Sequence, residues 1–249
     1  MSRKTALTIR DVALLQELVE RRAESLSYLE ARYFRGVRKT ARNRLRRLEV
    51  GGYVTRKDVE TIEHPGRLGS VYRLGPAARA ALRLRSPYAA EAWLGRRFSA
   101  TLPDSSMPHQ IATNRVGDWL GARLLPEHLL PVHEPNAQRH RPDGVYRCAA
   151  PDSMGRRLVF LEVDLGHYSR QRILGKVDAF LDHPDARSIL FVAHNERRSS
   201  ITSQWIREKY GEAIMDRVQP LTFDQIREGG WLDPGTEPAQ GPDADALAA

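Results

Sequence analysis

The sequence predicts an α+β protein of two domains, a small basic domain of helices with a β-hairpin and then a larger α/β domain. Charge supports this division, because residues 1–85 hold 20 Lys and Arg against 9 Asp and Glu. Residues 86–249 hold 19 against 22, so the net charge changes from +11 to −3 between the two parts. Hydrophobic patterning supports it too, since buried strands alternate with helices only in the second part. A basic block on an otherwise neutral chain indicates a polyanionic partner, above all nucleic acid.

The domain boundaries are expected from composition. Residues 1–85 form the basic domain, the proline-containing stretch 86–107 is a linker, and residues 108–232 form the α/β domain. Residues 233–249 contain three prolines and four acids without a basic residue, which is typical of a disordered tail. No apolar run approaches the roughly 18 residues of a membrane span, so a cytoplasmic protein is expected. The single cysteine, Cys148, excludes an internal disulfide.

Two helices are predicted at the start of the basic domain. Residues 8–22 carry apolar side chains at spacings of three and four, which places them on one helix face. Thr8 and Asp11 have the spacing of a capping box at the start of this helix. A second, short helix is expected over residues 25–34, with Gly36 as the breaker that follows it.

A third helix and a β-hairpin complete this domain. The helix is predicted over residues 38–50 and ends at a pair of glycines. Two strands follow, at 53–56 and 70–74, with a turn expected at residues 64–67. Residues 75–84 read as a closing helix. Three helices followed by a hairpin define a winged helix-turn-helix, in which the hairpin is the wing.

The third helix carries most of the residues expected to contact DNA. The major groove of B-DNA admits one helix, and Arg and Asn side chains read guanine and adenine edges or hold phosphates. The alternative is that these arginines form only a solvated helix face. The predicted DNA-binding residues of the helix and the wing are Arg38, Lys39, Thr40, Arg42, Asn43, Arg46, Arg56, Lys57 and Arg67.

The second domain has the pattern of a mixed α/β sandwich. A helix, three strands, a helix, a strand, a helix and a last strand are predicted in that order. Their expected ranges are 109–125, 129–134, 143–146, 157–164, 169–181, 188–193, 196–210 and 215–223.

The motifs of this domain resemble the core of the PD-(D/E)XK nuclease-like fold. Pro142-Asp143 is followed by a hairpin, then by Glu162-Val163-Asp164, and then by a helix and a buried strand. The chain as a whole, over residues 8–223, resembles the replication-relaxation family of plasmid and mobile-element proteins, which pair a winged helix with such a core. The matching positions are Leu45, Leu48, Gly52-Tyr53-Val54, His109, Arg141-Pro142-Asp143, Phe160 to Asp164, Lys176 and Phe180. The resemblance implies DNA binding in plasmid replication initiation or in relaxosome function.

The resemblance also implies a candidate acidic site. Nucleases of this fold hold a divalent cation such as magnesium between Asp and Glu carboxylates, and the metal activates a water. Asp143, Glu162 and Asp164 are the candidate metal ligands. The lysine that usually stands two residues after the glutamate is replaced here by Asp164, and Lys176 in the following helix is the candidate to supply its charge. These four residues would be catalytic if the domain is an enzyme.

The missing lysine instead favours a domain without catalysis and without a cofactor, whose acids pair with arginines such as Arg141 and Arg172. The leading hypothesis is therefore a sequence-specific protein that binds double-stranded DNA in replication initiation or relaxosome assembly of a plasmid or conjugative element. Its expected partners are duplex DNA, a relaxase or replication proteins, and a second copy of the chain, with no membrane. A metal-dependent endonuclease directed by the winged helix and a transcriptional repressor remain as alternatives.

Overall fold

The chain of 249 residues is described here by a computed structural model. The described residues divide between Ala112 and Thr113 into two compact units, called here the N-terminal unit and the C-terminal unit. The structure describes residues 6–85, 102–121, 125–126, 142–148 and 151–229. The predicted strand 129–134, Arg141, most of the expected linker 86–107 and the expected tail 233–249 lie outside these ranges.

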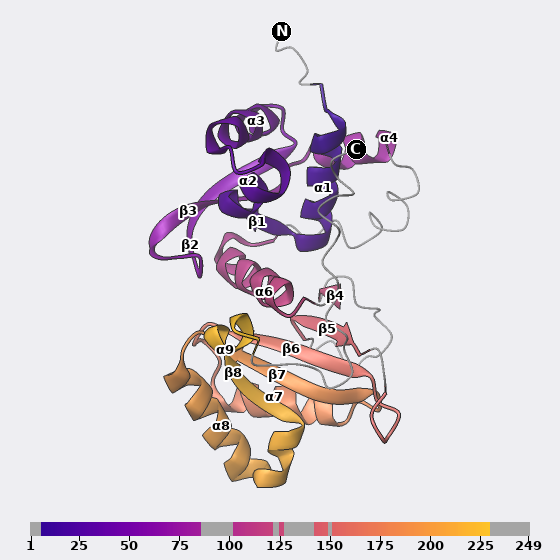
Figure 1. The fold of residues 1–249 in the computed structure, drawn as a ribbon, viewed down its shortest axis with the longest axis vertical. Helices are drawn as coiled ribbons and strands as arrows, with labels where there is room; N and C mark the ends of the chain where they lie inside the picture. Colours follow the sequence, from indigo (N-terminus) through magenta and orange to yellow (C-terminus); the bar gives the residue numbers. More distant parts are fainter. Residues whose placement is uncertain (1–5, 86–101, 122–124, 127–141, 149–150, 230–249) are drawn as a thin grey trace. The chain divides into compact units, whose positions relative to one another are not determined.

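The N-terminal unit combines helices with a three-stranded antiparallel sheet (Figure 1). Its elements are α1 (Ile9–Arg21), β1 (Ala23–Ser25), α2 (Leu26–Phe34), α3 (Arg38–Val50), β2 (Val54–Thr61), β3 (His64–Leu74), α4 (Ala78–Arg85) and a 3-10 turn (Asp104–Ser106). The predicted capping box is confirmed, because the Thr8 side chain accepts from the backbone N–H of Asp11 and the Asp11 carboxylate accepts from that of Thr8. Helix α6 (Met107–Trp119) begins in this unit and ends in the C-terminal one.

The core of this unit lies between the helices and one face of the sheet. The helical residues that are fully buried there include Leu14, Leu15, Leu18, Leu29, Ala41, Leu45 and Leu48. Val54 and Tyr72 join this core from the sheet, where Val54 pairs with Leu74 and Arg56 with Tyr72. Side chains alternate across a strand, so Val59 and Val71 face the other way. They pack there against a second apolar cluster that includes Met107 and Ile111.

The hairpin departs from its prediction. The turn expected at residues 64–67 is wrong, because the chain reverses at Ile62-Glu63 and residues 64–67 belong to β3. Thr61 pairs with His64 and Glu60 with Leu68, so β3 has three residues between these pairs where β2 has none. Pro65, Gly66 and Arg67 are thus extruded from the ladder as a bulge. Proline and glycine are signals of a bulge as well as of a turn, which explains the misplacement.

The C-terminal unit is a mixed sheet of order β4-β5-β6-β7-β8, with helices. Strands β4 to β6 are antiparallel, whereas β6, β7 and β8 run parallel. The elements are β4 (Leu125–Pro126), β5 (Gly144–Arg147), β6 (Leu158–Asp164), α7 (Arg170–Leu181), β7 (Ala186–Ala193), α8 (Glu196–Tyr210), a 3-10 turn (Glu212–Asp216), β8 (Val218–Thr222) and α9 (Phe223–Arg227).

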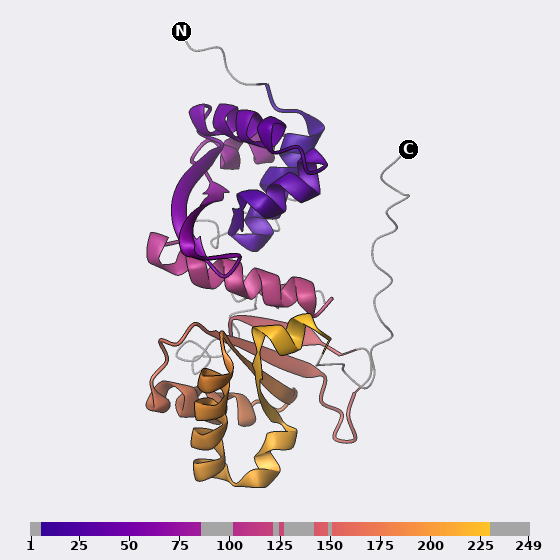
Figure 2. The same cartoon turned by 60° about the vertical axis from the view of Figure 1, so that its left-hand side comes forward.

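Helices α7 and α8 cover one face of this sheet, as the rotated view also shows (Figure 2). Phe160 of β6 stacks on Phe180 of α7 with 4.9 Å between ring centroids, and Ile206 of α8 joins the same apolar cluster. Trp119 at the end of α6 meets Phe223 of α9 edge to face. All residues of β7 except Arg187 are buried, as expected for a central parallel strand.

The observed elements follow the predicted order closely. Helices 38–50 and 196–210 have the predicted bounds, while β2 and β3 extend well beyond the predicted strands. The predicted helix 109–125 ends earlier, at Trp119, and β1, β4 and α9 were not predicted. None of the helices in the described ranges has the length and hydropathy needed to span a bilayer.

Candidate nucleic-acid interface and acidic site

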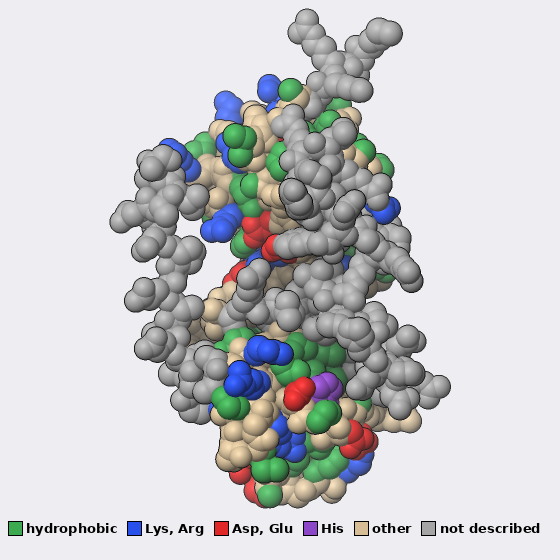
Figure 3. Space-filling view, turned by 90° about the vertical axis from the view of Figure 1, so that its right-hand side faces the viewer, with side chains coloured by type: hydrophobic (Ala, Val, Ile, Leu, Met, Phe, Trp, Pro, Cys, Tyr) green, Lys and Arg blue, Asp and Glu red, His purple; other side chains and the backbone are tan. Residues whose placement is uncertain are grey.

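One face of α3 is basic and open to solvent. Ala41, Leu45 and Leu48 are fully buried, and the rest of the helix surface consists largely of long polar side chains. The predicted contact residues that are exposed on it are Arg38, Lys39, Thr40, Arg42, Asn43 and Arg46, to which the structure adds Arg47. Figure 3 shows Lys and Arg side chains standing out from the surface of the N-terminal unit. A helix with this distribution can be held firmly by its apolar stripe while it presents charge to a ligand.

The start of α3 is electrostatically unfavourable in the free protein. Val37 at the N-cap makes no side-chain hydrogen bond to the helix, and the first turn has no acidic residue. Arg38 and Lys39 place positive charge at the positive end of the helix dipole, where an anion would be favourable. Arg38 is only partly compensated by Glu30, at 3.9 Å. A phosphate group could accept from the free backbone N–H groups and neutralise these side chains.

Arg44 is the exception among the arginines of α3, because it faces the protein. Its Nε donates to Asp11 Oδ1 at 2.9 Å, a terminal nitrogen donates to Oδ2, and the same nitrogen donates to the carbonyl of Ala6. Burial alone would raise the pKa of Asp11, but the hydrogen bonds from Arg44 and Thr8 outweigh it and hold the pKa below its usual value. Arg44 therefore orients α3 on α1 and is not available to a ligand.

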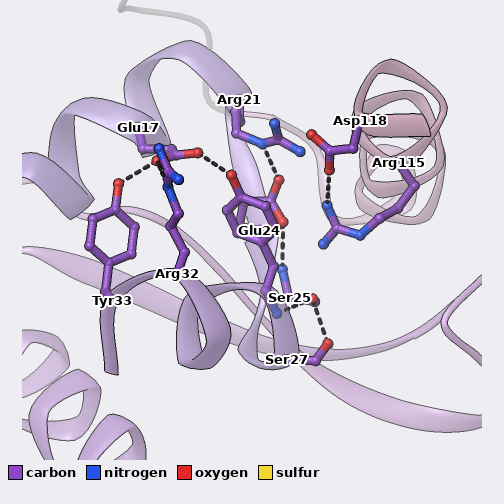
Figure 4. A network of polar contacts seen from close by, with 10 residues as sticks. Glu17, Arg21, Glu24, Ser25, Ser27, Arg32, Tyr33, Arg115 and Asp118 are labelled. Atoms are coloured by element: carbon purple, nitrogen blue, oxygen red, sulfur yellow. Dashed lines mark hydrogen bonds and ion pairs between the residues drawn. The ribbon is translucent and has the colours of Figure 1, made fainter. Parts of the chain in front are cut away.

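Helices α1 and α2 are tied together by a second polar network (Figure 4). The hydroxyls of Tyr28 and Tyr33 both donate to the carboxylate of Glu17, and Arg32 lies 4.0 Å from it. Burial, and then the bond to Glu17, raises the pKa of both tyrosines, so they remain neutral donors. Next to this network, Arg21 pairs with the fully buried Glu24. These contacts fix the helix that precedes α3.

The residues of the hairpin that were predicted to contact DNA do not all lie on the same face. Arg56 lies on the face that carries Val54, toward the helices, and is exposed. Lys57 lies on the opposite face, where its Nζ is 3.1 Å from Asp104 Oδ2. The hydrogen bond from Lys57 is the chief cause that lowers the pKa of Asp104, and Arg73 pairs with the same carboxylate. The structure therefore groups Arg56 with the helical side of the unit and separates Lys57 from it, while Arg67 is exposed in the bulge.

The acidic site is built on β6 and α7. Glu162 is completely buried on β6, and its Oε1 accepts from Nζ of Lys176 at 2.6 Å. Lys176 is itself only 5% exposed. Burial, followed by the negative charge of Asp143, raises the pKa of Glu162 well above its ordinary value, although Lys176 opposes the shift. The second oxygen of Glu162, Oε2, is buried and lacks a hydrogen-bond partner among the described residues.

Asp164 has a different environment at the end of β6. Its Oδ1 accepts from the backbone of Gly166 at 2.8 Å, and its Oδ2 accepts from Nε of Arg198 at 2.6 Å. Arg198, from α8, also donates to the carbonyl of Tyr168. Asp164 is 2% exposed. Through its bonds to Gly166 and Arg198, its buried carboxylate holds the loop that follows β6.

Asp143 is oriented by the neighbouring strand, because its Oδ2 accepts from the backbone N–H of Val163 at 2.7 Å. Arg172, predicted to pair with an acid, lies over the ring of Tyr168 at 4.0 Å. Within the predicted set, Glu162 pairs with Lys176 and is affected by the charge of Asp143, whereas Asp164 pairs with Arg198. No group of three or more His, Cys, Asp or Glu in the described ranges has the arrangement of a metal site.

These residues fit a divalent cation poorly. Lys176 already neutralises one oxygen of Glu162, and Asp164 is held by Arg198. A hard cation needs several oxygen ligands, and Mg²⁺ usually keeps waters as well. A fully buried Glu162 leaves little room for such a hydrated ion. The catalytic and metal-binding roles given to these residues stay predictions.

Two structural contacts, those of Arg44 and Arg198, were not predicted from the sequence motifs. Arg44 lies three residues after Ala41 and four before Leu48, so its position at the edge of the buried stripe was a usable signal. Arg198 had no such signal, since it is 34 residues from Asp164 and reaches it only through the packing of α8.

The fold and these sites define a mixed α+β protein with a basic helical unit and a second unit built on a mixed sheet. The family model described as replication-relaxation matches residues 15–184, which is more than half of the chain. The chain belongs to the replication-relaxation family, and membership implies a role tied to replication or relaxation. No curated protein and no solved structure matches the chain. The matched range includes α3, the hairpin, Glu162 and Lys176 but ends before Arg198.

Proposed function

We propose that the N-terminal unit is a winged helix-turn-helix domain that binds double-stranded DNA, with α3 in the major groove and the β2–β3 hairpin as the wing. The protein would recognise a site in replication initiation or relaxosome assembly of a plasmid or conjugative element. The single observation that carries the proposal is the exposed basic face of α3 on a fully buried apolar stripe. Membership of the replication-relaxation family supports it.

The contacts within the unit support a particular set of residues for this interface. Arg42, Asn43 and Arg46 are exposed along the middle of α3 and would face base edges and flanking phosphates. Arg38, Lys39 and Thr40 surround the uncapped helix start and would hold a phosphate. Arg56 and Arg67 extend the surface onto the wing. Lys57 is left out of the interface because it pairs with Asp104 on the other face.

For the C-terminal unit we propose a PD-(D/E)XK nuclease-like fold that serves as a scaffold. The order α6, β4, β5, β6, α7, β7 supports this assignment, because it places one helix before three strands and a second helix before a fourth strand. The pairing of Glu162 with Lys176 inside the protein favours a structural role for the acids. Its partners would be a relaxase, replication proteins or a second copy of the chain.

DNA binding is tested with the full chain and labelled duplexes taken from a random pool by repeated selection. Fluorescence anisotropy across a series of salt concentrations should give an affinity that falls steeply with salt, because phosphate contacts release counterions. The double variant Arg42→Ala/Arg46→Ala should lower the salt slope by about 2, close to one unit for each phosphate that is no longer neutralised. Asn43→Ala should relax base preference at a cost of about 1–3 kcal/mol.

Arg207→Ala is the matched control, because Arg207 is also an exposed arginine in a helix but lies on α8 and pairs with Glu212. It should leave both the affinity and the salt slope unchanged. Binding that does not depend on salt, or an equal loss of affinity in the control, would contradict the proposed interface.

The second candidate is a metal-dependent endonuclease, favoured by the meeting of Asp143, Glu162 and Lys176. Supercoiled and linear DNA are incubated with the wild type and with Glu162→Ala, in magnesium or in manganese. We expect no cleavage by either protein and retained DNA binding by the variant. Magnesium-dependent nicking that disappears in Glu162→Ala and in Lys176→Ala would replace the scaffold role by an enzymatic one.

A further inference from the structure

The extruded segment of β3, Pro65–Arg67, is followed directly by an exposed apolar side chain. Leu68 is 74% exposed, and Pro65, Gly66 and Arg67 before it are exposed as well. Three consecutive residues without partners on β2 make this a larger interruption than the usual one-residue bulge. Bulges redirect side chains, and here the bulge carries one cation, Arg67, and ends at one large apolar group, Leu68.

The segment is held in place by the protein itself. Glu60 Oε1 accepts from the backbone N–H of Gly66 at 2.7 Å, across the base of the bulge. Gly66 has φ +72, a conformation that favours glycine, and a side chain added there would meet no atom within 4 Å. The constraint is therefore the backbone conformation and its bond to Glu60, which gives the bulge a defined shape in the absence of packing.

The position of Leu68 relates it to the proposed interface. Leu68 pairs with Glu60, Tyr72 with Arg56 and Leu74 with Val54, so these residues share one face of the hairpin. That face is covered by the helices at its base, through Val54 and Tyr72, and is open at Leu68. Single exposed apolar residues are ordinary on protein surfaces. This one stands on an anchored protrusion, next to a cation, and on the face shared with Arg56.

We propose that the bulge Pro65–Arg67 and the adjoining Leu68 enter the minor groove of the bound duplex, where Arg67 lies along the groove and Leu68 inserts at a base step as an apolar wedge. The proposal rests on the DNA binding proposed above and adds the element that deforms the DNA. The minor groove attracts arginine through its negative potential, and an apolar side chain placed between base pairs unstacks them and bends the duplex. The Leu68 side chain would thus be buried only in the complex with DNA. This burial would account for a leucine at a site that is exposed in the free protein.

The test compares affinity and DNA bending in the same complexes. The probe is a selected duplex of about 30 base pairs, or about three helical turns, with a donor and an acceptor dye at its ends. Wild-type protein should increase energy transfer by bending the duplex. Leu68→Ala should lose most of this increase and bind about tenfold more weakly, because the apolar area it buries is reduced. Its salt slope should stay unchanged, whereas Arg67→Ala should lower the slope by about 1.

Two kinds of variant control for folding and for general surface effects. Leu68→Met keeps an apolar side chain of similar volume and should retain bending. Met154→Ala removes an apolar side chain that is likewise 74% exposed, in the C-terminal unit, and should bend DNA as the wild type does. All variants should melt at the wild-type temperature, because Leu68 makes little contact in the free protein.

Wild-type affinity and bending in Leu68→Ala would overturn the wedge while leaving the proposed DNA binding intact. An equal loss of bending in Leu68→Met, or in the exposed control Met154→Ala, would overturn it as well. Absence of any duplex binding by the wild type would instead remove the proposed function on which the inference rests.

Discussion

Arg44 of α3 donates two hydrogen bonds to Asp11, the residue that completes the cap of α1. Asp11 is fully buried, and the Arg44 side chain is 15% exposed. One carboxylate thus satisfies the start of the first helix and also fixes the helix proposed to enter DNA. The stability of the unit and the orientation of α3 are coupled through this pair.

The first prediction concerns the stability that Asp11 provides. Asp11→Ala removes the acceptor of Arg44 and half of the capping box, so the free energy of unfolding should fall by about 3 kcal/mol or more. Asp58→Ala is the matched control, because Asp58 also pairs with an arginine, Arg56, but both side chains are exposed. The control should cost less than about 1 kcal/mol. Urea unfolding of both variants measures the difference, and similar losses of stability would contradict the structural role of Asp11.

The second prediction concerns pH. Hydrogen bonds hold the pKa of Asp11 below its ordinary value of 3.8 in the folded protein, although burial opposes the shift. The unfolded chain then binds the proton more readily, so stability is present above the ordinary pKa and is lost as pH falls through the lower, folded pKa. Asp11→Asn should remove this contribution. Unfolding free energies measured between neutral pH and acid should therefore decline less in Asp11→Asn than in the wild type, and parallel curves would refute the assignment.

The third prediction separates two neighbouring basic residues of the β2–β3 hairpin. Arg56 is exposed on the face shared with the helical core, whereas Lys57 pairs with Asp104 on the other face. Arg56→Ala should weaken binding to all duplexes and lower the salt slope by about 1, whereas Lys57→Ala should leave the slope unchanged. The two variants remove the same charge from adjacent positions, so each controls for the other. Equal effects on the slope would show that the duplex contacts both faces of the hairpin.

Much of this fold could be predicted from the sequence where the pattern is local. The stripe of Ala41, Leu45 and Leu48, followed by two glycines, is enough to place α3 with its observed bounds. The bulge was not predictable, because Pro65-Gly66 is compatible with a turn and only the pairing of Glu60 with Leu68 excludes it. Strand β1 has only three residues, and its partner strand is β3. Three residues are too few to show the alternation of apolar and polar side chains from which a strand is predicted.

The candidate site was predictable in its residues and less so in its partners. The spacing of Glu162 and Asp164 on β6 is that of two residues on the same face of a strand, and both are buried in the structure. Their cations come from different helices: Lys176 from α7 and Arg198 from α8. Which cation pairs with which acid depends on how the two helices pack on the sheet. This packing is a property of the tertiary structure and cannot be predicted from the spacing of residues in the sequence.

The last prediction tests Lys176 as the built-in counter-charge of Glu162. Lys176→Met should cost about 3–5 kcal/mol near neutral pH, because a buried carboxylate then lacks its cation. Burial already raises the pKa of Glu162 above its ordinary 4.5, and loss of Lys176 should raise it further. The folded protein then holds the proton more tightly than the unfolded chain, so stability should fall as pH rises above 4.5. Glu162→Gln/Lys176→Met removes both charges with similar shapes, and should recover much of the lost stability and remove all of this added pH dependence. The measurement is the free energy of unfolding of both variants across a range of pH. A double variant as unstable as Lys176→Met would mean that Lys176 stabilises the fold through packing alone and not as the counter-charge of Glu162.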